Sequence, residues 1–176
     1  RTRTSSNRDI RFEVNTVAPY LITRELLPII DSGGIVVNLS SAAQRPVDLK
    51  ALREFKDMSD MEAYAQSKLA ITAWSHALGR EFADGPCIVA VNPGSLLATK
   101  MVKEGFGIEG NDINIGSDIL VRFVNDPEYS KRTGGYFDND SGGFAPMHET
   151  ATDDAFIDEL IKGLDQIIAE AGLNFG

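Results

Sequence analysis

One tyrosine and one lysine of this chain stand at a spacing that could support acid–base chemistry. Tyr64 and Lys68 are four residues apart inside a long helical pattern, which places both side chains on one face, about one turn from each other. An ammonium group beside a phenol stabilises the phenolate, which suits the phenol to proton transfer near neutral pH. The same spacing occurs by chance on many surface helices. The elements around the pair must decide between an acid–base site and an ordinary solvent-facing helix.

Two short apolar runs predict strands that end in polar or turn-forming residues. Residues 35–39 and 87–91 are rich in β-branched side chains, as expected of buried parallel strands. The first run ends in Ser40-Ser41, and the second ends in Asn92-Pro93-Gly94. Ligands of open parallel sheets bind outside the carboxyl ends of the strands, so both turns are candidate site segments.

Helical patterns alternate with these strands. Apolar residues at helical spacing predict helices over residues 9–30 and 152–171. We also expect helices over residues 60–83 and 116–124, and shorter helical segments near 49–55 and 99–104. Residues 134–138 predict a third short strand. Pro19 lies inside the first helix, so we expect a kink there and a carbonyl of Asn15 without its helical donor. The alternation predicts one α/β domain over residues 1–176, with a parallel sheet of three short strands and flanking helices.

Composition and charge exclude several classes of function. A net charge of −9 and a pI of about 4.7 make nucleic acid and anionic membrane surfaces poor partners. The single cysteine, Cys87, excludes an intrachain disulfide. The only histidines, His76 and His148, are far from Cys87 in sequence, so a zinc site built from Cys and His is not expected. No apolar run approaches the ~18 residues of a membrane span. Without a recognisable secretory signal, we expect a cytoplasmic protein.

Four signatures, in this order along the chain, together resemble the short-chain dehydrogenase/reductase family. They are Val14-Asn15, Asn38-Leu39-Ser40-Ser41, Tyr64 with Lys68, and Asn92-Pro93-Gly94 with a following Thr99. The resemblance covers nearly the whole chain. The long stretch between the second and third signatures is most similar to the retinol-dehydrogenase-like branch. The resemblance implies the C-terminal portion of a Rossmann-like, doubly wound sheet and an NAD(P)-dependent oxidoreductase that moves hydride between nicotinamide and a carbonyl or alcohol substrate.

The resemblance also implies roles for four catalytic residues. Tyr64 would exchange a proton with the substrate oxygen, and Ser41 would hydrogen-bond that oxygen, with Ser40 the less favoured of the two serines. Lys68 would bind the ribose hydroxyls of the cofactor and stabilise the phenolate. Asn15 would hold a water molecule that relays protons toward Lys68, a role that suits the carbonyl released by the proline.

The cofactor-binding residues are fewer than the family pattern requires. Tyr64 and Lys68 would contact the cofactor, Pro93 and Gly94 would line the nicotinamide, and Thr99 would contact the cofactor amide or pyrophosphate. Thr99 stands one residue further from Gly94 than the family pattern, which weakens its assignment. The Gly-rich N-terminal βαβαβ unit of the family has no counterpart here. The sequence therefore does not distinguish NAD from NADP, and no readable pattern identifies the substrate.

Residues 105–110 match the pattern G-x-G-x-x-G, but no strand directly precedes them. Because a dinucleotide-binding turn needs a strand before it and a helix after it, we expect a loop on the substrate side instead. A second interpretation of the whole chain therefore stays open. It could be a truncated, catalytically inactive remnant that folds and self-associates without binding cofactor.

Assembly follows from the resemblance as well. Family members commonly form homodimers through the helix pair that corresponds to residues 9–30 and 60–83. Both helices carry apolar residues outside a single stripe, namely Leu21, Ile71, Trp74 and Leu78. We therefore expect a homodimer through these two helices.

Overall fold

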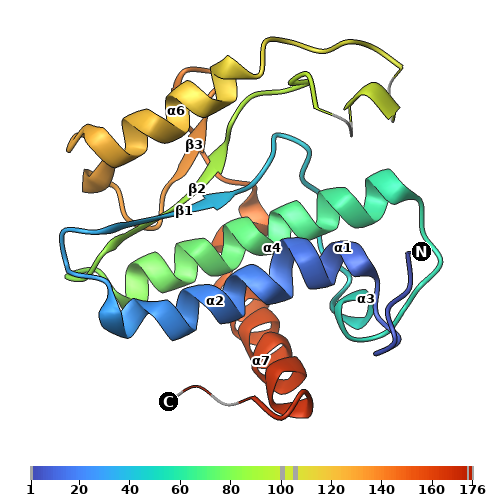
Figure 1. Cartoon of the computed structure of the whole chain (residues 1–176). Coiled ribbons are helices and arrows are strands. Elements are labelled where there is room, and N and C mark those ends of the chain that lie inside the picture. Colours follow the sequence, from blue (N-terminus) through green and yellow to red (C-terminus); the bar gives the residue numbers. More distant parts are fainter. Residues whose placement is uncertain (1, 100–101, 105–106, 174, 176) are drawn as a thin grey trace.

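The computed structural model describes residues 2–99, 102–104, 107–173 and 175, and its elements follow the alternation expected from the sequence (Figure 1). The strands are β1 (Ile35–Leu39), β2 (Cys87–Asn92), β3 (Tyr136–Asp138) and β4 (Gly143–Phe144). Among the described residues, the α-helices include α1 (Ile10–Phe12), α2 (Ala18–Leu26), α3 (Leu49–Arg53), α4 (Asp60–Glu81), α6 (Asn114–Asn125) and α7 (Asp154–Glu170). Short 3-10 turns cover Leu27–Ile29, Tyr129–Lys131 and Glu149–Thr152.

The sheet has the strand order β1-β2-β3-β4. The pairs β1–β2 and β2–β3 are parallel, as expected, whereas β3 and β4 pair in antiparallel fashion. The prediction of three strands was therefore incomplete. With two residues, β4 is too short to produce an alternating pattern, and only its pairing with β3 across a tight turn defines it as a strand.

The two strands predicted as buried differ in their surroundings. Every residue of β2 is buried, because β2 lies between two neighbouring strands with helices on both faces. In β1 only Asn38 is fully buried, and Leu39 is 45% exposed. The prediction of burial was wrong for β1, since a β-branched run predicts a strand but does not reveal that the strand ends the sheet.

Helices cover the two faces of the sheet unequally (Figure 1). On one face, α4 runs beside α2, and α7 crosses both of them from the side away from the sheet. The larger core lies between these helices and includes the fully buried side chains of Trp74, Leu160 and Leu164. On the other face, α6 packs Ile119 and Phe123 against the sheet.

The first predicted helix is interrupted before its proline. A π-helical turn at Glu13–Val17 separates α1 from α2, and the N–H of Ala18 bonds the carbonyl of Glu13, five residues back. The interruption expected from Pro19 is therefore present, as a widened turn. A proline cannot donate a backbone hydrogen bond, so a wider turn just before it costs less there than elsewhere in a helix.

The remaining helices lie close to their predicted positions. Of the short helix expected over 99–104, residues 102–104 are helical, while residues 100 and 101 lie outside the described residues. Within the described part of the chain, no helix combines the length and the apolar composition that crossing a bilayer requires.

Candidate active site

The helix that carries the tyrosine–lysine pair is set by its N-terminal sequence. Ser59 caps α4, with its hydroxyl accepting a hydrogen bond from the N–H of Glu62, and Asp60 adds negative charge to the first turn. Tyr64 and Lys68 follow in the next turns and are both half-buried. The ammonium nitrogen of Lys68 lies 5.6 Å from the centre of the Tyr64 ring, a cation–π distance. The two side chains therefore meet, as their spacing predicts.

Lys68 links this helix to the carboxyl end of β1. Its Nζ donates a 2.7 Å hydrogen bond to the carbonyl of Leu39. The N–H of Cys87 donates to the carbonyl of Gly34, and the N–H of Ser40 donates to the carbonyl of Val91. Within one peptide unit the N–H and the C=O point in opposite directions, so the carbonyl of Leu39 points away from β2. Burial lowers the pKa of Lys68 from 10.5 to about 8, because desolvation disfavours the ammonium form.

Asn15 contacts the same turn of α4 by a hydrogen bond to Ser67. The side-chain amide of Asn15 donates to the hydroxyl of Ser67 at 3.0 Å, and that hydroxyl donates to the carbonyl of Tyr64 at 2.7 Å. The hydroxyl of Thr16 also bonds the carbonyl of Ser67, at 3.0 Å. The π-helical turn is therefore bonded to α4 at the residues that follow Tyr64.

The two serines after β1 have different surroundings. The hydroxyl of Ser40 is buried between the hydroxyl of Thr72, at 2.7 Å, and the carbonyl of Lys68, at 3.1 Å. Ser41 is half-buried, and its hydroxyl accepts a 3.2 Å hydrogen bond from the N–H of Ala43. A serine hydroxyl that accepts one bond can still donate its own proton. Ser40 therefore fastens β1 to α4, while Ser41 can donate to a ligand.

Two residues that the sequence did not single out hold the backbone of Ser41. Tyr136 donates its hydroxyl proton to the Ser41 carbonyl at 3.1 Å, and Gln44 donates to the same carbonyl at 2.8 Å. The side-chain oxygen of Gln44 is buried without a hydrogen-bond partner among the described residues. Only a tyrosine hydroxyl on a strand that ends in Asp138 could have drawn attention to Tyr136.

The turn after β2 is clamped against the loop after β3. The side-chain amide of Asn92 donates to Asp138 at 2.7 Å and to Asp140 at 2.8 Å, and the backbone N–H of Ser95 donates to Asp140 at 2.8 Å. Between these contacts Gly94 has φ +130°, a conformation that favours glycine. Pro93 and Gly94 thus form a fixed surface at the carboxyl end of β2.

The structure gives Thr99 a local role. Its hydroxyl accepts a hydrogen bond from the N–H of Val102 at 3.3 Å, in the manner of a helix cap. In the G-x-G-x-x-G match, residues 105 and 106 lie outside the described residues. Residues 107–110 form a loop, and Gly110 packs against the backbone of Ala98. The described part of this segment has no strand–turn–helix geometry.

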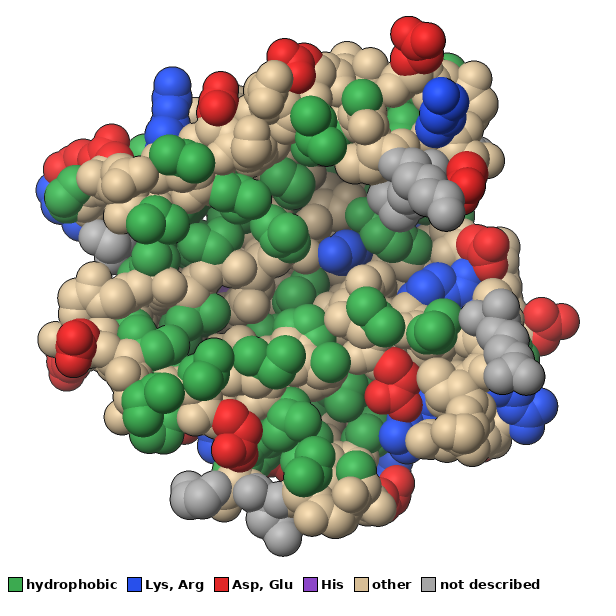
Figure 2. All heavy atoms as spheres, in the orientation of Figure 1, with side chains coloured by type: hydrophobic (Ala, Val, Ile, Leu, Met, Phe, Trp, Pro, Cys, Tyr) green, Lys and Arg blue, Asp and Glu red, His purple; other side chains and the backbone are tan. Residues whose placement is uncertain are grey.

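Hydrophobic side chains surround the region in front of β1. Figure 2 shows a hollow between α6 and the layer of α2 and α4, with hydrophobic atoms on both sides of it. Leu39 on β1, Ile115 on α6 and Ile22 on α2 are 45%, 47% and 56% exposed. The end strand of the sheet therefore lies between two partly uncovered apolar helix faces.

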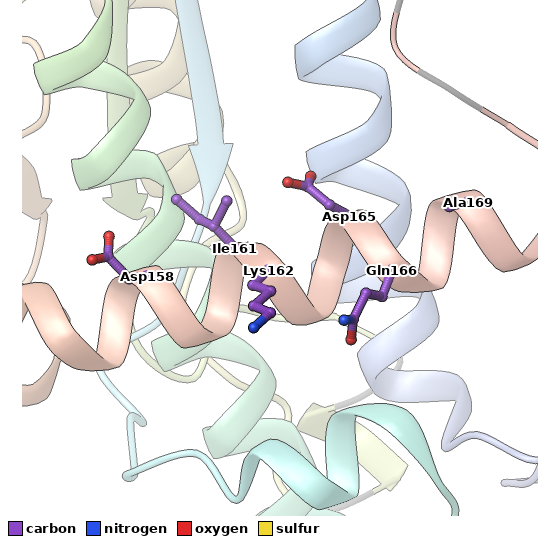
Figure 3. Close-up of a pocket in the computed structure, with 6 residues that line it drawn as sticks. All are labelled: Asp158, Ile161, Lys162, Asp165, Gln166 and Ala169. Atoms are coloured by element: carbon purple, nitrogen blue, oxygen red, sulfur yellow. The ribbon is translucent and has the colours of Figure 1, made fainter.

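A separate shallow hollow lies on the outer side of α7 and contains none of the candidate catalytic residues. Figure 3 shows the six residues that line it, all from this one helix: Asp158, Ile161, Lys162, Asp165, Gln166 and Ala169. Among the described residues, no group of three or more His, Cys, Asp and Glu side chains could hold a metal ion. The acid–base site at the strand ends is therefore the better candidate for chemistry.

The fold resembles several solved structures, one of them an uncharacterised protein and two of them reductases by name. A protein from Mycobacterium paratuberculosis is 19% identical with a TM-score of 0.64, and the match covers 98% of this chain and 62% of that one. Carbonyl reductase Sniffer of D. melanogaster is 21% identical, with a TM-score of 0.54 and coverages of 82% and 60%. Landomycin C-6 ketoreductase LanV, solved with bound NADP and rabelomycin, is 23% identical, with a TM-score of 0.51 and coverages of 72% and 48%. The chain thus spans less than two thirds of the length of these structures.

A comparison with curated proteins finds no match. The sequence does match a family model. The family model of the short chain dehydrogenases matches residues 3–107, which include Asn15, Ser41, Tyr64 and Lys68. This match covers more than half of the chain and agrees with the fold and with the four signatures of the sequence. The chain belongs to the short-chain dehydrogenase/reductase family.

Proposed function

We propose that this chain carries the proton-transfer side of an NAD(P)-dependent oxidoreductase acting on a carbonyl or alcohol substrate. One observation carries the proposal. The 2.7 Å hydrogen bond from Lys68 to the carbonyl of Leu39 brings the Tyr64–Lys68 turn of α4 to the carboxyl end of β1, where Ser41 follows. We infer that the Tyr64 phenol, the Lys68 ammonium group and the Ser41 hydroxyl serve one substrate oxygen at this end of the sheet, as proton donor, positive charge and hydrogen-bond donor.

Each of these residues has a defined task in the proposed reaction. Tyr64 would donate its phenolic proton to the substrate oxygen during reduction and accept a proton during oxidation. Ser41 would donate a hydrogen bond to the same oxygen, since its hydroxyl proton is not needed for the bond from Ala43. Lys68 would hold its ammonium group beside the Tyr64 ring, 5.6 Å from the ring centre. With a pKa of about 8, Lys68 could also pass a proton onward near neutral pH.

The residues present fit one end of a nicotinamide cofactor. Pro93 and Gly94 would line the nicotinamide ring, and Lys68 would bind the adjoining ribose hydroxyls. When bound, the cofactor supplies or accepts the hydride. Because the hydroxyl of Thr99 caps the segment that follows it, we propose only a weak role for Thr99 in cofactor binding. The described residues offer no comparable cradle for the adenosine end, so we expect weak cofactor affinity for this chain by itself.

Conversion of Tyr64 to Phe tests the proposal directly. We expect Tyr64→Phe to bind NADPH or NADH as the wild type does and to lose about 10²–10⁴-fold in turnover of a panel of small aldehydes and ketones. Tyr129→Phe is a matched control, because Tyr129 packs in the aromatic cluster under α6, with Phe123 and Phe137. Wild-type turnover by Tyr64→Phe would refute the assignment.

The second candidate function is a folded remnant that binds no cofactor. The partly buried strand β1, which lies at the edge of the described sheet, favours this candidate. Intact mass and thermal shift separate the two candidates. A mass near 19.1 kDa with no NADPH-induced shift supports the remnant, whereas a shift or a larger mass supports the enzyme.

Finer features of the protein are also proposals. We infer a retinol-dehydrogenase-like branch and a cytoplasmic location from the sequence alone. The homodimer through residues 9–30 and 60–83 needs a qualification, because Ile71, Trp74 and Leu78 are buried within the chain. Pairing through α4 would require α7 to move aside, whereas the outer face of α2 keeps Ile22 exposed. Light scattering tests the dimer, and a monomeric mass would refute it.

A further inference from the structure

The backbone of Ser41 is held from two directions. Gln44 lies three residues away on the same loop, so its bond to the Ser41 carbonyl moves with the loop. Tyr136 lies 95 residues away in β3, so its bond joins the loop to the sheet. The N–H of Ser40 already bonds the carbonyl of Val91 on β2, one residue before Ser41. The Tyr136 bond adds a second attachment to the sheet, at the Ser41 carbonyl itself.

Tyr136 is well suited to be a fixed donor. Its residue is 7% exposed, and β3 pairs with β2 on one side and with β4 on the other. Burial and the nearby charge of Asp138 raise the pKa of Tyr136 to about 12. The phenol therefore keeps its proton, and its ability to donate, throughout the neutral range.

We propose that Tyr136 is a positioning residue of the candidate active site, whose hydroxyl holds the Ser41 backbone and thereby fixes the Ser41 hydroxyl beside the substrate oxygen. The inference rests on the proposed function, because it takes Ser41 as the substrate-oxygen donor. The Ser41 hydroxyl also accepts a bond from the N–H of Ala43. Any shift of the Ser41 backbone should therefore weaken that bond, which makes the Ala43 amide a direct reporter.

Amide hydrogen exchange measured by NMR tests the positioning without any need for activity. In Tyr136→Phe we expect the Ala43 amide to exchange about five- to tenfold faster than in the wild type, as for the loss of one net hydrogen bond. Tyr20→Phe is the matched control, since Tyr20 donates a similar 2.9 Å bond to Asp165 far from this loop. Unchanged exchange at Ala43 in Tyr136→Phe would overturn the proposal.

A kinetic double-mutant cycle tests whether Tyr136 acts through Ser41. We expect Tyr136→Phe to lower kcat about fivefold in the wild-type background and to cause no further loss in a Ser41→Ala background. An equal loss in both backgrounds would mean that Tyr136 acts independently of Ser41, and the proposal would fail. If the wild-type protein shows no turnover with NADH or NADPH, the proposed function fails, while the exchange experiment still decides the positioning.

The fluorescence of Trp74, the only tryptophan, checks that each variant is folded. Should Tyr136→Phe fail to fold, Tyr136→His replaces it, since the imidazole keeps a ring and an N–H donor. If the Ala43 amide is better protected in Tyr136→His than in Tyr136→Ala, and closer to its wild-type protection, the donor role is supported. Equal protection in the His and Ala variants would contradict it.

Discussion

The lowered pKa of Lys68 makes the stability of this protein depend on pH in a direction that can be measured. Burial lowers the pKa of the amine from 10.5 to about 8 in the folded chain. Between these values the unfolded chain binds more protons than the folded one, so the free energy of unfolding rises with pH. We expect this rise in the wild type and its absence in Lys68→Met.

The magnitude follows from the two pKa values. Integrating the proton linkage from pH 7 to pH 9.5 gives a gain of about 2 kcal/mol for the wild type relative to Lys68→Met. This is an upper value, because the Lys68–Leu39 bond lies near solvent and water offsets part of the desolvation. For a chain of this length, about 2 kcal/mol corresponds to roughly 4–8 °C in melting temperature.

Urea unfolding followed by Trp74 fluorescence measures the effect, because Trp74 is fully buried in the folded chain. Cys87 and Tyr136 also have raised pKa values, which lower stability at high pH. Their contribution cancels in the difference between wild type and variant. Lys162→Met is the control, since it removes the same charge from an exposed position on α7. If the curve of Lys68→Met runs parallel to that of the wild type from pH 7 to pH 9.5, the reasoning is refuted.

Further predictions concern packing, and urea titration measures each of them. Gly79→Ala in α4 should destabilise by about 1–3 kcal/mol, because the new Cβ would lie 2.2 Å from the backbone nitrogen of Gly134. Gly163→Ala in α7 should stabilise by about 0.5–1 kcal/mol, since its Cβ would meet Leu52 at an ordinary 3.6 Å; the same sign for both changes would contradict this account. Leu164→Ala should cost about 2–5 kcal/mol, whereas the 47% exposed Leu173 should tolerate alanine within about 0.5 kcal/mol.

Local sequence patterns predicted the elements that carry the candidate site. The helix expected over residues 60–83 placed Tyr64 and Lys68 on one face, because a helix imposes that relation whatever it packs against. The apolar run of β2 predicted a buried strand, and the following Pro93-Gly94 predicted its end. In each of these cases the relevant interaction lies within a few residues along the chain.

Relations between distant segments could not be predicted in the same way. The apolar stripe of α7 was visible, but nothing in it showed that the helix would cover Trp74 and Leu78 on α4. Those two side chains therefore pointed to a partner chain before the structure showed them in the core. The bond between Tyr136 and Ser41 joins residues 95 positions apart and leaves no periodic signal.

The position of α4 explains why these distant contacts matter for the proposed chemistry. One side of the helix presents Tyr64 and Lys68 to the carboxyl end of β1, and the opposite side packs under α7. The buried residues of α4 therefore fix the position of the helix that carries Tyr64 and Lys68. The Ser40 hydroxyl adds a bond from the end of β1 to the backbone carbonyl of Lys68. A change in the α7 interface could tilt the helix and lengthen the Lys68–Leu39 bond without touching the site. We therefore expect stability and the proposed proton transfer to be coupled through one helix, because the surface that fixes its orientation also belongs to the main core of the domain.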